Sequence, residues 1–195
     1  MRRILLATLL LLAGCNGDDS PTVSAGDDTT TTSSTTTSST TAGTSTSSTT
    51  PGVLFMMPPS GTARAYLKGV QVAAQGKVDR VVFEFEGALP GYEIALVERP
   101  VAEDGSGDEV RVEGAALLRV RLDNAAGARI EGERVVEVYT GPDRVRGSGT
   151  RVVVEAVDAG DFEGTVTWVI GLKAKAEVKV STLESPHRLV VDVTA

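Results

Sequence analysis

The chain has 195 residues, a formal net charge of -7, one cysteine (Cys15) and one histidine (His187). An acidic chain repels nucleic acid and anionic lipid head groups, so we expect no nucleic-acid partner. The sequence offers no disulfide, no multi-histidine metal site and no nucleophile–base pair, so we expect neither a cofactor nor a metal and no enzymatic activity.

The first predicted element is a secretory signal peptide over residues 1–14. Arg2 and Arg3 make a basic start, and an apolar run follows from Ile4 to Ala13, which is typical of such signals. Ten helical residues reach about 15 Å, whereas the bilayer core is about 30 Å thick. A transmembrane anchor is therefore the weaker interpretation.

The signal ends in "LAGC" at residues 12–15, which resembles the lipobox of bacterial lipoproteins. That resemblance implies cleavage after Gly14 and a diacylglyceryl group on the sulfur of Cys15. A plain secreted protein is the alternative. Two acyl chains hold a protein at a membrane where one would slip off. We therefore expect lipid anchoring on the extracytoplasmic face of the bacterial cell membrane, facing the cell wall.

Residues 15–57 are predicted to be the lipidated N-terminus and a disordered tether. From Thr29 to Thr50 every residue except Ala42 and Gly43 is serine or threonine, and such sequence cannot bury a core. As a coil the tether has an r.m.s. reach of about 35 Å. It would hold the folded part off the membrane.

Residues 58–195 are expected to form one domain. Its sequence has short apolar–polar alternations separated by glycine, proline and acidic turns, and no helical period. This pattern predicts an all-β fold, a small antiparallel β-sandwich or a barrel. The predicted strands are 66–73, 80–86, 92–97, 118–122, 135–139, 152–157, 166–170, 177–181 and 189–193.

Two of these strands share a pattern, which indicates half-units related by a pseudo-two-fold. Arg80-Val-Val-Phe-Glu84-Phe matches Arg188-Leu-Val-Val-Asp192-Val, and each arginine and its acid lie on the outward face. An antiparallel register that sets Arg80 opposite Asp192 also sets Glu84 opposite Arg188. Two charge pairs, each worth about 0.2–1 kcal/mol, would then form. Strands in separate sheets would instead leave both charged faces free for a ligand.

Four longer motifs carry a resemblance. "DRVVFEFEGALPGYEI", "EDGSGDEV", "GDFEGTVTWVIGL" and "SPHRLVVDV" occur in this order and together resemble the AMIN-like domain of actinobacterial lipoproteins. That domain is related to the AMIN domain of cell-wall amidases and secretins. The resemblance covers most of the chain beyond Tyr66. It implies a β-sandwich of two small sheets and a non-catalytic module that binds peptidoglycan or another envelope glycan.

A different class of function stays open beside the glycan-binding one. A protein-interaction or assembly module would recruit an envelope enzyme or a secretion component through an edge strand or the acidic loops. The candidate glycan-binding residues are Arg80, Glu84, Arg188, Asp192, Tyr92 and Tyr139.

The four charged candidates have two interpretations. They form either a polar platform for the hydroxyl and acetamido groups of a glycan or a mixed-charge solvent face that contributes little energy. The two tyrosines lie beside Pro-Gly and Gly-Pro turns. We expect them at a rim, with an ordinary half-exposed tyrosine as the alternative.

Other residues suggest chemistry, but packing or turn roles are favoured. Trp168 alternates with apolar neighbours, which favours the core over stacking on a sugar. The stretch from Asp104 to Asp108 has alternating oxygen ligands but lacks the EF-hand pattern, so a hairpin loop is favoured over a calcium site. The acids between Asp158 and Glu163 share one short loop, which favours a turn over a glycosidase acid pair.

Overall fold

The structure is a computed structural model that describes residues 52–195. The predicted signal peptide, the lipidation site Cys15 and most of the predicted tether lie outside the described residues. The described part is all β and sandwich-like, which confirms the predicted fold class. Within it, no helix has the length and apolar character needed to span a bilayer.

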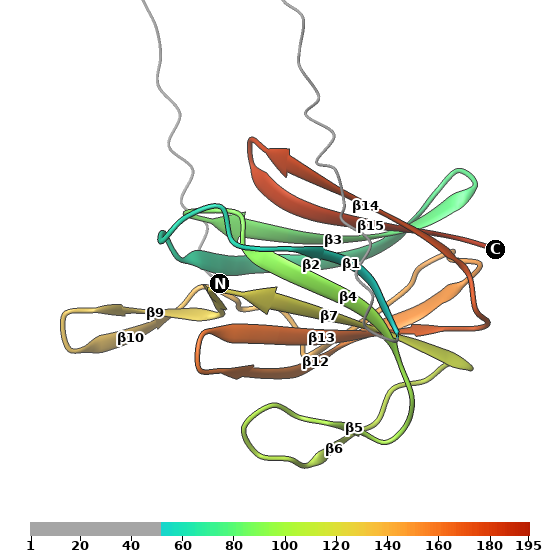
Figure 1. Ribbon diagram of the computed structural model, residues 1–195, viewed down its shortest axis with the longest axis horizontal. Helices are drawn as coiled ribbons and strands as arrows, with labels where there is room; N and C mark the ends of the chain where they lie inside the picture. Colours follow the sequence, from blue (N-terminus) through green and yellow to red (C-terminus); the bar gives the residue numbers. More distant parts are fainter. Residues whose placement is uncertain (1–51) are drawn as a thin grey trace, which may run out of the picture. The chain divides into compact units, whose positions relative to one another are not determined.

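Two sheets form the layers of the sandwich (Figure 1). The six-stranded sheet contains, in spatial order, β1 (Val53–Met57), β4 (Gly91–Val97), β7 (Ala116–Asp123), β13 (Thr165–Leu172), β12 (Val153–Phe162) and β11 (Arg144–Arg146). The five-stranded sheet contains β14 (Glu177–Glu184), β15 (His187–Thr194), β3 (Val78–Glu86), β2 (Ala65–Gln75) and β8 (Ala125–Ala126). Neighbouring strands are antiparallel, except that β2 and β8 run parallel.

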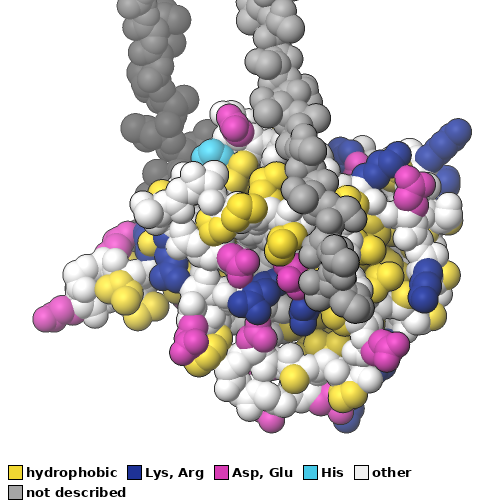
Figure 2. Space-filling model, in the orientation of Figure 1, with side chains coloured by type: hydrophobic (Ala, Val, Ile, Leu, Met, Phe, Trp, Pro, Cys, Tyr) yellow, Lys and Arg dark blue, Asp and Glu magenta, His cyan; other side chains and the backbone are white. Residues whose placement is uncertain are grey.

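Two short hairpins leave the sandwich. β5 (Val101–Ala102) pairs with β6 (Glu109–Val110) over the outer face of the six-stranded sheet, and β9 (Ala128–Glu131) pairs with β10 (Arg134–Glu137) in an arm that projects to one side (Figure 1). Figure 2 shows apolar side chains on this arm beside acidic ones. Ile130 and Val135 lie opposite each other there and are 77% and 72% exposed.

The core lies between the two sheets, with Trp168 near its centre. The indole is fully buried and meets the ring of Phe83 edge-on, with 6.2 Å between ring centroids. Because Phe83 is on β3 and Trp168 on β13, this contact joins the two sheets. The core position predicted for Trp168 is confirmed.

The folded part begins earlier than the predicted boundary at residue 58. β1 pairs antiparallel with β4, and Met57 lies opposite Tyr92. The residues assigned to the end of the tether therefore belong to the six-stranded sheet. The sequence "VLFMM" is continuously apolar, so it lacks the alternation from which the other strands were predicted.

The predicted strand 135–139 also needs correction. β10 covers Arg134–Glu137 and belongs to the projecting arm, where the alternation of apolar side chains marks no buried face. The other predicted strands all coincide with observed ones, namely β2, β3, β4, β7, β12, β13, β14 and β15.

The strands that share a sequence pattern are neighbours in one sheet. β3 and β15 pair antiparallel, with Arg80 opposite Asp192 and Glu84 opposite Arg188. Of the two arrangements that the charge pattern left open, the structure shows the paired one, in which the four charges engage one another instead of standing free for a ligand. Val82 lies opposite Val190 at the midpoint of the four charges, so a local two-fold axis there exchanges the two arginines. The axis also relates the hairpins β2–β3 and β14–β15, which lie on either side of it.

Candidate functional site

The outer face of the five-stranded sheet carries two arginine–carboxylate pairs. Arg80 donates from Nε and Nη2 to the two carboxylate oxygens of Asp192 at 2.7 and 2.8 Å. Arg188 donates from Nε to Oε2 of Glu84 at 2.9 Å, and its Nη2 forms an ion pair with the same oxygen at 2.8 Å. The residues therefore bind in two pairs, and contacts through two nitrogens restrict the orientation of each guanidinium group.

These contacts also set the charge states on this face. The hydrogen bond from Arg188 lowers the pKa of Glu84 below its usual value, and Lys68 contributes in the same direction from 3.5 Å. The hydrogen bond to Asp192 raises the pKa of Arg80. Because the pairs are partly exposed to solvent, they add little to stability.

A shallow hollow of about 250 Å³, which we call the platform hollow, lies between the two pairs. Apolar side chains and ion-paired arginines both face it. Its lining residues are Gly69, Gln71 and Gln75 of β2, Arg80, Val82 and Glu84 of β3, Leu183 of β14, and Arg188 and Val190 of β15.

Gly69 keeps part of the platform hollow open. It follows a register shift in the pairing of β2 with β3, between Leu67 and Gly69, which is typical of a β-bulge. A Cβ added at Gly69 would meet no atom within 4 Å. A larger side chain there would therefore enter the hollow without straining the backbone.

The platform hollow combines fixed donors, fixed acceptors and an apolar patch. Arg80 uses two N–H groups and Arg188 uses one in the hydrogen bonds to their partners, whereas a guanidinium has five. Val82 and Val190 supply an aliphatic surface between the pairs, and Gln71 adds an amide. Such a surface suits a ligand with many hydroxyl groups and an apolar face.

Neither candidate tyrosine lies at the platform hollow. The rim position expected for Tyr92 is wrong, because its side chain is only 2% exposed and belongs to the core. Tyr139 is half-buried and packs edge-on against Trp168, with 5.6 Å between ring centroids. Its hydroxyl donates to the carbonyl oxygen of Pro142 at 2.7 Å, and burial raises its pKa to about 12.

The loop from Asp104 to Asp108 connects β5 and β6. One carboxylate oxygen of Asp104 accepts a hydrogen bond from the Thr167 hydroxyl at 2.6 Å, and the Asp104 N–H donates to the carbonyl oxygen of Ala159 at 2.8 Å. These contacts fasten the loop to the six-stranded sheet. Nowhere in residues 52–195 do three or more metal-binding side chains cluster.

The acids near Phe162 serve separate backbone segments. Asp158 accepts a hydrogen bond from the Gly160 N–H at 2.9 Å, and Asp161 accepts one from the Gly127 N–H at 2.6 Å. Burial raises the pKa of Asp158. The turn predicted for this stretch is shorter than expected, because Asp158 and Asp161 lie within β12, opposite Trp168 and Val166 of β13, and only residues 163–164 form the turn.

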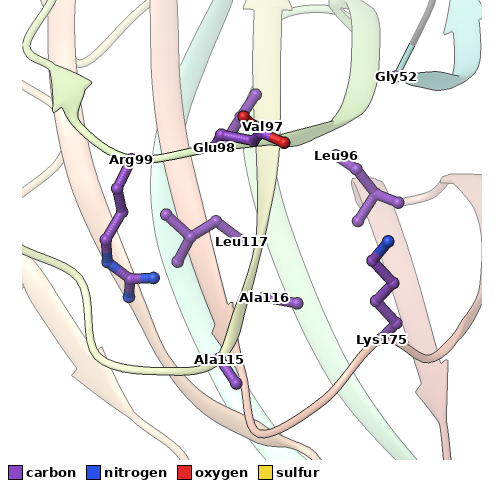
Figure 3. A pocket seen from close by; sticks show the side chains of 9 residues that line it. All are labelled: Gly52, Leu96, Val97, Glu98, Arg99, Ala115, Ala116, Leu117 and Lys175. Atoms are coloured by element: carbon purple, nitrogen blue, oxygen red, sulfur yellow. The ribbon is translucent and has the colours of Figure 1, made fainter.

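A larger cavity of about 430 Å³ lies at the ends of β4 and β7. Figure 3 shows Leu117 between Arg99 and Lys175, which flank the cavity on opposite sides. One Nη of Arg99 donates to the carbonyl oxygens of Val112 and Gly114 at 2.6 and 2.8 Å. The polar side chains that line this cavity form no paired donor–acceptor set like that of the platform hollow, so we assign no ligand to the cavity.

Sequence reasoning found the charged residues of the platform but missed the rest of its lining. Gly69, Gln71 and Gln75 reach the platform hollow only because β2 lies beside β3, and Leu183 only because β14 lies beside β15. No local signal in the sequence marks these residues.

Comparison with known proteins gives one match. The family model of the AMIN-like domain matches residues 65–195. The matched stretch contains β2, β3, β14 and β15, which line the platform hollow. No curated protein and no solved structure matches the chain.

Proposed function

The chain belongs to the AMIN-like domain family, and from this premise we propose that it binds peptidoglycan or another envelope glycan without catalysing a reaction. Domains of this family are envelope-associated and generally serve as non-catalytic binding or localisation modules. The observation that carries the proposal is the platform hollow between the Arg80–Asp192 and Arg188–Glu84 pairs.

The chemistry of the platform hollow matches that of a sugar ring. A pyranose has an apolar face of C–H groups, which would lie on Val82 and Val190, and a rim of hydroxyl or acetamido groups, which would meet the guanidinium and carboxylate groups. Because the arginines are already held by their partners, binding a glycan orders few additional side chains. Such preorganisation increases affinity.

Charged groups at both ends of the platform hollow favour a polymer as ligand. Arg80 lines the hollow on one side of the Val82–Val190 pair, and Arg188 and Glu84 line it on the other. Asp192 holds Arg80 but is not part of the lining. A glycan strand repeats its hydroxyl and acetamido groups along its length, so successive sugars would find charged hydrogen-bonding groups at both ends.

The N-terminal sequence supports a location at the membrane from which the domain could reach the glycans of the cell wall. We propose that a lipid on Cys15 anchors the chain to the extracytoplasmic face of the membrane and that the Ser/Thr-rich tether lets the domain search the wall space. The net charge of -7 gives no attraction to anionic membranes. The lipid would have to provide the attachment.

Sedimentation with insoluble cell wall tests the proposed function. The purified full chain is mixed with peptidoglycan sacculi and centrifuged over a range of pH and salt concentrations. We expect the protein in the pellet. A chain that stays wholly in the supernatant under all of these conditions contradicts glycan binding to the wall.

An assembly module is the second candidate, favoured by the position of β14. Among the described strands β14 has a neighbour on one side only, and a free sheet edge can pair with an extended segment of a partner. Cross-linking in cells followed by mass spectrometry separates the two functions. A dominant protein partner without retention on the wall supports assembly.

A further inference from the structure

A second polar hollow lies around an exposed aromatic ring on the six-stranded sheet. We call it the Phe162 hollow. Its volume is about 260 Å³, similar to that of the platform hollow, and it is lined by Asp104, Gly105, Arg121, Phe162, Glu163 and Thr165.

The two hollows face opposite sides of the sandwich. In β7, Val120 and Leu122 are core residues, so Arg121 between them points to the outer face of the six-stranded sheet. In β3, Phe83 and Phe85 are core residues in the same way, and Glu84 points outward from the five-stranded sheet. The sandwich core therefore separates the Phe162 hollow from the platform hollow.

The ring of Phe162 is exposed and yet held in place. It stands at the end of β12 with 48% of its surface exposed, although large aromatic side chains are mostly buried. A Cβ on Gly105, which has a φ of +96°, would lie 3.0 Å from the ring. The ring therefore rests directly on the backbone of the β5–β6 loop, and only glycine permits that close approach.

Two polar groups lie around the ring. Oδ2 of Asp104 is held by the hydroxyl of Thr167 at 2.6 Å, and the exposed Arg121 donates from Nε to Oδ1 of Asp123 at 3.1 Å. These contacts leave further guanidinium N–H groups and carboxylate lone pairs for a ligand. An aromatic face beside an arginine and a held carboxylate provides apolar contact together with hydrogen bonds.

We propose that the Phe162 hollow is a second saccharide subsite. In it, the ring of Phe162 stacks on the apolar face of a sugar, and Arg121 and Asp104 bind its hydroxyl groups. This inference rests on the proposed function, because the ligand at the Phe162 hollow is the same class of glycan. Since the two hollows face opposite sides, one domain would contact two glycan strands and cross-bridge them.

An NMR titration of the full chain with a soluble peptidoglycan disaccharide tests this inference. We expect amide shifts in two separate groups, one around Gly69, Glu84 and Val190 and one around Gly105 and Thr165. Phe162→Leu keeps an apolar side chain against Gly105 but removes the aromatic face. It should weaken binding at the Phe162 hollow about two- to tenfold and leave the platform hollow unchanged.

Three further variants make the result decisive. Ile130→Ala, which shortens an exposed apolar side chain on the β9–β10 arm, is the control and should change neither group. Arg121→Gln removes a charged donor from the Phe162 hollow and should also weaken binding there. It replaces Phe162→Leu as the test if that variant lowers the thermal midpoint of unfolding. Gly69→Gln fills the platform hollow and should leave the second group of shifts intact.

The outcomes separate this inference from the proposed function. Shifts confined to the platform hollow, unchanged in Phe162→Leu, overturn the second subsite and leave the proposed function standing. The absence of shifts in both groups, together with no sedimentation on sacculi, contradicts the proposed function and the second subsite with it. Shifts at the Phe162 hollow that survive Gly69→Gln and are weakened by Phe162→Leu support the second subsite.

Discussion

Arg80 and Asp192 lie directly opposite each other on β3 and β15 and share two N–H···O hydrogen bonds of 2.7 and 2.8 Å. Arg188 and Glu84 lie opposite each other in the same register and share one hydrogen bond of 2.9 Å. Pairs this exposed contribute little to folding. Their main effect is to orient two guanidinium groups on either side of the platform hollow.

Replacing Arg80 should therefore affect binding more than stability. Arg80→Lys keeps the charge but cannot form the two-point contact. We expect wall affinity to fall about tenfold, because the planar guanidinium and its fixed N–H donors are lost from the platform hollow, and the free energy of unfolding to fall by only about 0.2–1 kcal/mol. Sedimentation and denaturant unfolding measure the two effects.

Arg129→Lys is the matched control for Arg80→Lys. Like Arg80, Arg129 hydrogen-bonds to carboxylates, in this case those of Glu86 and Glu131, but it does not line the platform hollow. The Arg129→Lys variant should therefore bind the wall as the wild type does. An equal loss of binding in both variants would show that the loss is not specific to the platform hollow, because neither substitution changes the net charge.

Asp79 should be a major determinant of stability. Its buried carboxylate accepts the backbone N–H groups of Arg151, Val152 and Val153 at 2.8, 2.5 and 2.9 Å. Asp79→Ala leaves these donors without the carboxylate, so we expect a loss of at least about 3 kcal/mol in the free energy of unfolding. Asp108→Ala, at an exposed acid, is the control for the denaturant experiment and should lose far less.

The same carboxylate predicts a dependence of stability on pH. Burial raises the pKa of Asp79, but the three backbone hydrogen bonds outweigh it and hold the pKa below the usual 3.8. A lowered native pKa means stability that is present above the unfolded-state pKa and lost as the pH falls through the native pKa. The stability difference between wild type and Asp79→Asn should therefore narrow in acid. Unfolding between about pH 3 and pH 7 measures it, and a constant difference would contradict this assignment.

Glu155 gives a second stability prediction. It is fully buried, forms an ion pair with Arg144 and accepts a hydrogen bond from the Glu113 N–H at 2.8 Å. Arg146 also lies near this carboxylate, with its Nη2 3.7 Å from Oε2. Arg144→Ala removes the hydrogen-bonded partner of a buried charge and leaves only this longer contact, so it should cost up to about 3–5 kcal/mol. Combining Arg144→Met with Glu155→Leu removes both charges and should cost less. A double variant less stable than Arg144→Ala would contradict the ion-pair explanation.

The proposed anchor is tested at Cys15. Cys15→Ser should abolish metabolic lipid labelling and either leave an uncleaved precursor or release the protein into the medium. Fractionation and labelling with a fatty-acid probe measure both results. A variant that stays membrane-bound and is processed normally would contradict lipidation at this residue.

The charge pattern could identify the register that makes two opposite-charge pairs, because the charges lie on the two strands themselves. It could not say whether these strands are neighbours in one sheet, which the structure shows. The sequence could not place Tyr92, because the neighbouring turn suggested a rim. The alternation with Ile94, a core residue of β4, instead puts Tyr92 in the core. Gly69 could not be found either, since its role depends on a bulge in β2 and on which strand lies beside it.

Binding of Gly69→Gln to insoluble peptidoglycan is the most direct test of the platform hollow. Gly61→Gln is the matched control, because a Cβ at either glycine meets no atom within 4 Å but only Gly69 lines the hollow. We predict that wild type and Gly61→Gln sediment with the wall while Gly69→Gln is largely lost from the pellet. Equal retention of all three proteins would contradict glycan binding at the platform hollow.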